Sequence, residues 1–137
     1  MVFWLLLLTI VVWGIAPILD KLAVQGTSPM LGNVFRSFTI IMIMLVITLF
    51  SGELKSIFKM PAKNVLYYVL SGILAGGIGV IAYYKVLQIA PTSKVVPIAA
   101  SYPLVTAILS MLFLGEKITP ERFIGTILVV TGIYLVK

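Results

Sequence analysis

Long apolar stretches without a charged residue dominate this sequence. Five such windows can be read directly, at 2–19, 37–52, 64–84, 95–115 and 123–136. A helix that crosses the hydrocarbon core of a bilayer needs about 20 apolar residues. The fifth window has only 14 residues, but it reaches the lower limit of about 17 if its helix begins at Pro120. Because the windows are continuously apolar rather than alternating, they predict spanning helices and not barrel strands.

The composition excludes several other classes of protein. Of the 137 residues, 61% are apolar and 10% are charged, whereas soluble domains have ~45–50% and ~25%. An ordinary soluble domain, a disordered chain and a disulfide scaffold are therefore excluded. The chain has no Cys and no His, so we expect no metal site and no cofactor. We also expect no enzyme activity, because no window holds a nucleophile–base pair or paired carboxylates.

The ends of the windows indicate where the helices begin and stop. Ser28-Pro29 and Thr119-Pro120-Glu121 are typical of helix starts. Gly26, Gly52 and Gly115 lie where chain reversals or helix ends are expected. The sequence predicts an all-α membrane protein with one domain over residues 1–137, a five-helix transmembrane bundle with helices near 2–24, 29–50, 62–88, 92–114 and 120–136.

The basic residues are divided almost equally between the two predicted membrane faces. Five crossings place Lys55, Lys59, Lys63, Lys117 and Arg122 on the face of the N-terminus, and Lys21, Lys85, Lys94 and Lys137 on the opposite face, with Arg36 as a possible fifth. Orientation follows the Lys/Arg bias between short loops. Either the chain inserts both ways up, or this count hides a bias. Because the net charge of +6 is spread over both faces, we expect no nucleic-acid partner.

Arg36 is the clearest candidate for a functional residue inside the membrane. It lies seven residues past Pro29, which is roughly 10 Å into its helix at about 1.5 Å per residue, and Asn33 lies on the same helix face. Ionisable residues inside spans are costly and mark functional sites. Both residues face a polar cavity that holds an anionic group, or else Arg36 reaches to the interface or pairs with a carboxylate such as Asp20.

Two other predicted helices carry unusual residues. Pro97 and Pro103 predict kinks, because each removes a backbone hydrogen bond, and such helices commonly line transport paths. Pro17 predicts a third kink, close to Trp13, which either packs in the bundle or lines a cavity. Tyr83 and Tyr84 are interfacial anchors or stack on a substrate. As substrate contacts we predict Arg36 and Asn33, with Trp13, Tyr84, Lys94, Ser101 and Tyr102 as secondary candidates.

Small residues recur at helical spacing in two of the windows. Gly72, Gly76 and Gly79 lie in the third window, and Gly125 and Gly132 lie seven residues apart in the fifth. This spacing predicts that helix backbones approach closely, inside one bundle or between two.

A set of short motifs resembles the EamA domain of the drug/metabolite transporter superfamily. They are Lys94-Val95-Val96-Pro97-Ile98, Pro103-Leu104, Leu114-Gly115-Glu116-Lys117, and Gly125 with Gly132-Ile133-Tyr134, and Trp13-Gly14, Pro17 and Lys21 agree. Most members carry two five-helix units in inverted orientation, and this chain looks like one such unit, half of an inverted-repeat transporter. The resemblance implies a homodimer, and the loop charges permit an antiparallel one.

The sequence departs from the related small multidrug resistance transporters in its first helix. Those proteins use a Glu there to exchange protons for cationic drugs, and the matching position holds Trp13. The basic residues favour anionic, zwitterionic or phosphate-bearing solutes instead. We therefore expect a secondary transporter of a small metabolite or of a phosphate-bearing or lipid-linked solute, which works by alternating access. We expect it in a prokaryotic-type inner membrane, with a small-molecule substrate, membrane lipid and a second copy as partners. The alternative is a non-transporting accessory or scaffold subunit.

Overall fold

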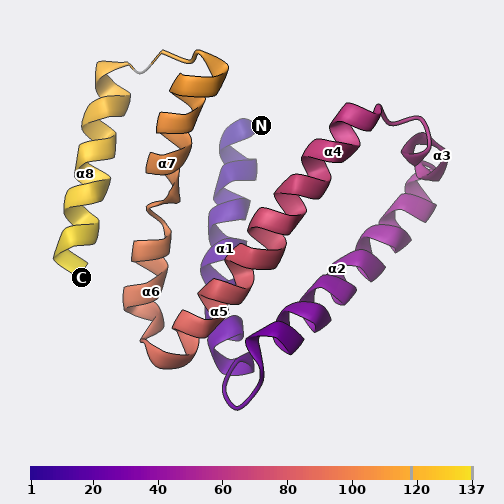
Figure 1. Cartoon of the computed structure of the whole chain (residues 1–137), viewed down its shortest axis with the longest axis horizontal. Helices are drawn as coiled ribbons and strands as arrows, with labels where there is room; N and C mark the ends of the chain where they lie inside the picture. The colour runs from indigo at the N-terminus through magenta and orange to yellow at the C-terminus, as the bar shows by residue number, and fades with distance from the viewer. Residues whose placement is uncertain (118, 137) are drawn as a thin grey trace. The chain divides into compact units, whose positions relative to one another are not determined.

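The computed structural model describes residues 1–117 and 119–136, and its regular elements there are all helices (Figure 1). Lys137, which enters the charge count above, lies outside the described residues. The elements are α1 (Val2–Ala23), α2 (Pro29–Ser51), α3 (Leu54–Ile57), α4 (Ala62–Ser71), the π-helix η1 (Gly72–Gly79), α5 (Val80–Ile89), α6 (Thr92–Ala99), α7 (Tyr102–Leu109), the π-helix η2 (Ser110–Leu114) and α8 (Pro120–Val136).

Among the described residues, four helical segments are long and apolar enough to cross a membrane. They are Val2–Ala23, Pro29–Ser51, Ala62–Ile89 and Thr92–Leu114. The structure buries none of the residues in the most apolar window of the first three, and 6% in the last. Apolar side chains that point outward along whole helices are unfavourable in water and are stable in the hydrocarbon core of a membrane. The chain is therefore an all-α integral membrane protein; α8 has 17 residues and does not reach this length.

Five threonine hydroxyls inside the helices are hydrogen-bonded within the helix that carries them. Each of five donates to the carbonyl four residues earlier, over 2.7–3.2 Å: Thr9, Thr39, Thr48, Thr106 and Thr131. This bond removes the cost of placing a hydroxyl in an apolar surrounding. These polar residues therefore do not mark a binding site.

The helix ends are set by glycines, as the sequence predicted. Gly26, Gly52 and Gly115 have φ of 71°, 74° and 66°, a left-handed conformation that side chains with a Cβ rarely adopt. The start of α2 also agrees, since Ser28 is its N-cap and Pro29 its first residue. The Ser28 side chain makes no capping hydrogen bond, so proline supplies the start signal there.

The chain forms two compact units. Residues 18–88 form one, called here the central unit, and residues 1–17 with 89–137 form the other, called the terminal unit. The helix α1 contributes to both, because the division falls directly after Pro17, which lies inside it.

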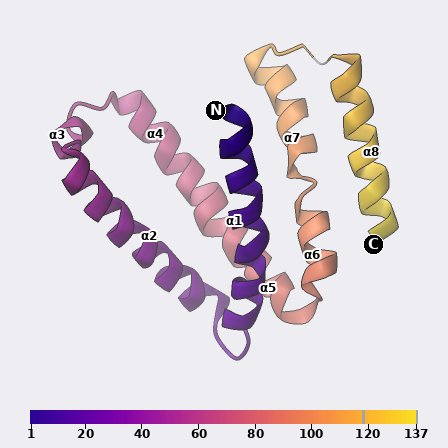
Figure 2. The ribbon, with the colours of Figure 1, turned by 180° about the vertical axis from the view of Figure 1, so that it is seen from behind.

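In the terminal unit the segment Thr92–Leu114 is interrupted between α6 and α7, and α8 packs against α6 (Figure 2). Pro103 lies in the first turn of α7 and has no N–H to donate to the carbonyl of the preceding turn. The Ser101 N–H turns instead to the Ile98 carbonyl at 3.1 Å. The predicted distortion at Pro103 is therefore a break in the helix, whereas Pro97 lies within α6.

Candidate binding groove

The central unit is held together where α5 passes the turn between α1 and α2. Gln88 Nε2 donates to the Val24 carbonyl at 2.9 Å and to the Thr27 carbonyl at 2.7 Å. Lys21 Nζ donates to the carbonyl of Leu87. Val24 and Leu87 are 1% and 0% exposed, so this junction forms the packed core of the unit. It fixes the end of α5 next to the start of α2.

One turn earlier on α5, Tyr84 links all three of these helices. Its hydroxyl donates to Asp20 Oδ1 on α1 at 2.7 Å, and its ring lies against Gly32 on α2, where a Cβ would be 3.5 Å from the ring. Tyr84 is 3% exposed. Its interpretation as an interfacial anchor is therefore wrong, because a headgroup anchor needs its hydroxyl at the water-facing surface.

Asp20 makes no direct ion pair with Arg36 in the described part of the chain, although the sequence allowed one. Its carboxylate accepts from the Tyr84 hydroxyl, and the Arg36 guanidinium acts electrostatically on that same hydroxyl. Within the described part of the chain, no carboxylate makes an ion pair with Arg36. Arg36 therefore keeps an exposed cationic group close to the Asp20–Tyr84 pair.

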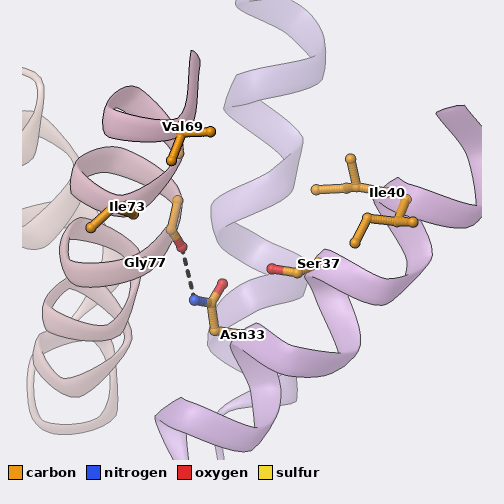
Figure 3. Close-up of a pocket in the computed structure, with 9 residues that line it drawn as sticks. Asn33, Ser37, Ile40, Val69, Ile73 and Gly77 are labelled. Atoms are coloured by element: carbon orange, nitrogen blue, oxygen red, sulfur yellow. Dashed lines mark hydrogen bonds between the residues drawn. The ribbon is translucent and has the colours of Figure 1, made fainter. Parts of the chain in front are cut away.

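Asn33 joins α2 to the π-helix η1. Its Nδ2 donates to the Gly76 carbonyl at 2.8 Å, and the residue is 8% exposed (Figure 3). In a π-helix each backbone bond spans five residues rather than four, and such segments often lie at functional sites. Gly79 suits this geometry, because a Cβ there would be 3.1 Å from the Leu74 carbonyl oxygen. The Asn33 side chain therefore ties α2 to the irregular part of the facing helix.

The glycines predicted to permit close packing do not do so inside their own unit. A Cβ at Gly72, Gly76, Gly125 or Gly132 would meet no atom within 4 Å. Close approach between two bundles stays a prediction for these positions.

A groove runs between α2 and the facing α4–η1–α5 segment, and it has two parts that share Asn33, Ser37, Ile40 and Gly76. The polar part has a volume of about 310 Å³ and adds Arg36, Ala75 and Val80. The apolar part has a volume of about 460 Å³ and adds Ile41, Val69, Gly72, Ile73 and Gly77. In Figure 3, Asn33, Ser37 and Ile40 on α2 face Val69, Ile73 and Gly77 across it.

The sequence-predicted contacts are divided between the two units. Arg36 and Asn33 line the groove in the central unit, and Tyr84 lies beside Arg36. In the terminal unit, Trp13, Lys94 and Tyr102 are exposed, and Ser101 Oγ donates to the Ile98 carbonyl at 2.6 Å.

Sequence reasoning missed Ser37 and Gly32. Ser37 follows Asn33 by four residues, so helical spacing alone would have placed it on the same face. No comparable signal marks Gly32, because its role depends on the ring that lies against it.

The groove presents several hydrogen-bond donors on one side. A guanidinium, a hydroxyl and an amide can bind an anionic group. The described residues hold no group of three or more carboxylates, histidines or cysteines that could bind a metal ion.

Apolar helices long enough to span a membrane, with a cationic groove between two helical segments, define an integral membrane protein. Comparison with known proteins identifies its family: residues 1–137 match the EamA-like transporter family, and the chain belongs to that family. This family consists of membrane transporters of the drug/metabolite superfamily and not of enzymes, so the resemblance seen in the sequence is confirmed.

Three relatives illustrate the similarity. The chain is 26% identical to an uncharacterized transporter of a Sinorhizobium species, over 97% of this chain and 93% of that protein. It is 30% identical to an uncharacterized protein of Methanocaldococcus jannaschii, over 96% of this chain and 92% of that protein. An uncharacterized protein of Pseudomonas aeruginosa is 27% identical over 96% of this chain, which spans 44% of that relative. No solved structure matches the chain significantly.

Proposed function

We propose that this chain is a secondary transporter of a small anionic or zwitterionic metabolite, or of a phosphate-bearing or lipid-linked solute. The observation that carries the proposal is the position of Arg36. Its guanidinium lines a groove between two spanning segments and makes no ion pair with a carboxylate in the described part of the chain. A cation held in this way inside a membrane is costly unless it serves a ligand or an ion path.

The surrounding side chains favour an anionic ligand. Ser37 offers a hydroxyl, and Asn33 keeps one amide hydrogen beyond its bond to Gly76. Tyr84 is almost fully buried and would act by positioning Arg36 rather than by touching the ligand. Trp13, Lys94, Ser101 and Tyr102 are secondary candidates in the terminal unit.

The proposed transporter has five spanning helices and works as a pair of inverted units. At 17 residues α8 rises about 25 Å, which spans a thin or locally adjusted bilayer. The near-equal basic charge on the two faces supports insertion in both orientations. An antiparallel homodimer would then provide the two halves that rock around a central site in alternating access.

Flux into liposomes tests the proposal. We expect uptake of one or more members of a panel of anionic and zwitterionic metabolites, and a loss of about tenfold or more in the Arg36→Gln variant, because hydrogen bonds to charged groups are worth ~1.5–3 kcal/mol. Lys63→Gln is the matched control, since Lys63 is an exposed cation at the opposite end of the groove helices. Unchanged flux in folded Arg36→Gln protein would exclude the site. No flux of any solute would favour the accessory-subunit alternative.

Topology is tested separately by single cysteines. The chain has no native cysteine, so Ser56→Cys and Lys117→Cys can be labelled without background. Labelling of each position from both sides of the membrane supports dual insertion. Labelling from one side alone excludes the antiparallel homodimer.

A further inference from the structure

We infer that the groove binds a single-chain anionic amphiphile, with its headgroup at Arg36 and its alkyl chain along the apolar part. This deepens the proposed function and rests on it, because it assigns the substrate class of the same site. The inference starts from the order of the groove side chains along α2, from the polar end at Asn33 and Arg36 to the apolar end at Ile40 and Ile41.

The direction of this gradient matches one leaflet of a bilayer. Arg36 and Ile41 lie seven and twelve residues past Pro29, which is about 10 Å and about 18 Å along the helix. The hydrocarbon core is about 30 Å thick. A ligand that follows the groove therefore has its charged end near the headgroups and its other end near the middle of the membrane, as a lipid has.

The apolar part is suited to an alkyl chain and not to a polar solute. Besides Asn33 and Ser37, which both parts share, Ile40, Ile41, Val69 and Ile73 line it, and on one wall Gly72 and Gly77 expose backbone that no side chain covers. A fully polar solute would place its groups against these side chains without hydrogen-bond partners, which is unfavourable. Its volume of about 460 Å³ lies within the ~300–1,000 Å³ range of small-ligand sites.

A helix from a second copy fits the groove less well. Such a helix would cover the Arg36 guanidinium, and a covered cation needs a carboxylate partner. The four acidic residues of the chain are Asp20, Glu53, Glu116 and Glu121. Asp20 is bonded to Tyr84, and the other three lie outside the helices or in the first turn of α8. No spanning helix therefore carries a carboxylate at the required depth.

Photolabelling in nanodiscs of phosphatidylcholine tests this inference. The probe is octyl phosphate with a diazirine near the end of its chain, and octanol with the same diazirine is the uncharged control. We expect the phosphate probe to label Ile41, Val69 and Ile73, and the alcohol to label lipid-facing residues of all spanning helices. The labelled sites are read by mass spectrometry of the whole chain.

Two variants and two controls separate the headgroup from the chain. Arg36→Gln removes the cation, and Gly72→Leu fills the apolar part from a position where a Cβ meets no atom within 4 Å. Each should lower groove labelling about tenfold, because about 1.4 kcal/mol corresponds to tenfold in affinity. Lys63→Gln and Gly14→Leu, whose Cβ also meets no atom within 4 Å, should leave labelling unchanged.

Three results of the photolabelling experiment would contradict this inference, and they can be told apart. Labelling that spreads over all helices in both wild type and Arg36→Gln overturns the inference. Labelling that depends on Arg36 but falls outside Ile41, Val69 and Ile73 rejects the amphiphile as the ligand. In that case the anion site at Arg36 and the proposed function still hold. A third result is that the wild-type protein shows no groove labelling and that Gly72→Leu changes the oligomeric mass. This result would identify the groove as a contact between copies, and it also overturns the inference.

Discussion

Replacing Tyr84 with phenylalanine removes one oxygen atom from the junction of α1, α2 and α5. That oxygen donates to the Asp20 carboxylate at 2.7 Å from a side chain that is 3% exposed. Neutral hydrogen bonds between membrane helices average about 0.6 kcal/mol and reach about 1.7 kcal/mol, whereas bonds to charged groups contribute ~1.5–3 kcal/mol. Because the partner is a carboxylate, we expect Tyr84→Phe to lower the free energy of unfolding by about 1.5–3 kcal/mol.

The adjacent tyrosine gives a matched control. Tyr83 is half-buried, and its hydroxyl is not bonded to Asp20, so Tyr83→Phe should cost less than about 0.5 kcal/mol. Unfolding can be followed in mixed micelles by energy transfer between dyes on introduced cysteines at the exposed positions Leu22 and Asn64, since the chain has no native cysteine. Equal costs for Tyr84→Phe and Tyr83→Phe would refute the reasoning.

A double-mutant cycle with Asp20→Asn then isolates the pair. If the Tyr84 hydroxyl acts through Asp20, the two substitutions together cost less than the sum of the single ones, with an interaction energy of about 0.5–3 kcal/mol. Additive costs would show that Tyr84 stabilises the unit through its ring alone.

Three further changes follow from the geometry. Gly79→Ala should lower the midpoint of unfolding, because the new Cβ would lie 3.1 Å from a carbonyl oxygen of η1. Gly72→Ala should raise the midpoint slightly, because its Cβ meets no atom within 4 Å and alanine reduces the backbone freedom of the unfolded chain. The reverse order of the two midpoints would contradict the π-helical geometry. Gln88→Ala removes two hydrogen bonds and should cost about 1–3 kcal/mol at ~0.5–1.5 each, while Gln25→Ala, an exposed glutamine, serves as the control in the same unfolding assay. Pro103→Ala restores a backbone donor and should slow amide hydrogen exchange across the break between α6 and α7; unchanged exchange there would mean that the break does not depend on proline.

The helix ends could be predicted from the sequence because single residues determine them. Gly26, Gly52 and Gly115 each take a left-handed conformation that is strained for most other residues. Pro29 likewise begins α2. Such signals are local and need no knowledge of the rest of the chain.

Part of the groove could also be predicted, because helical spacing places Asn33, Arg36 and Ser37 on one face. The hydrogen-bond partner of Asp20 could not be predicted from the sequence. The sequence shows a carboxylate near Lys21 and Arg36, but which donor reaches it depends on how α5 passes α1, and there a tyrosine takes the bond. The π-helix η1 could not be predicted either, because a glycine-rich run of this kind is equally compatible with an ordinary α-helix.

The π-helix η1 determines which way the following helix faces. If Gly72–Gly79 rewound with α-helical hydrogen bonds, α5 would rotate about its axis by about 100° for each residue of register gained. Tyr84 and Gln88 would then turn away from Asp20 and from the α1–α2 turn. Rewinding of this one segment would therefore undock the end of α5 from both neighbouring helices together.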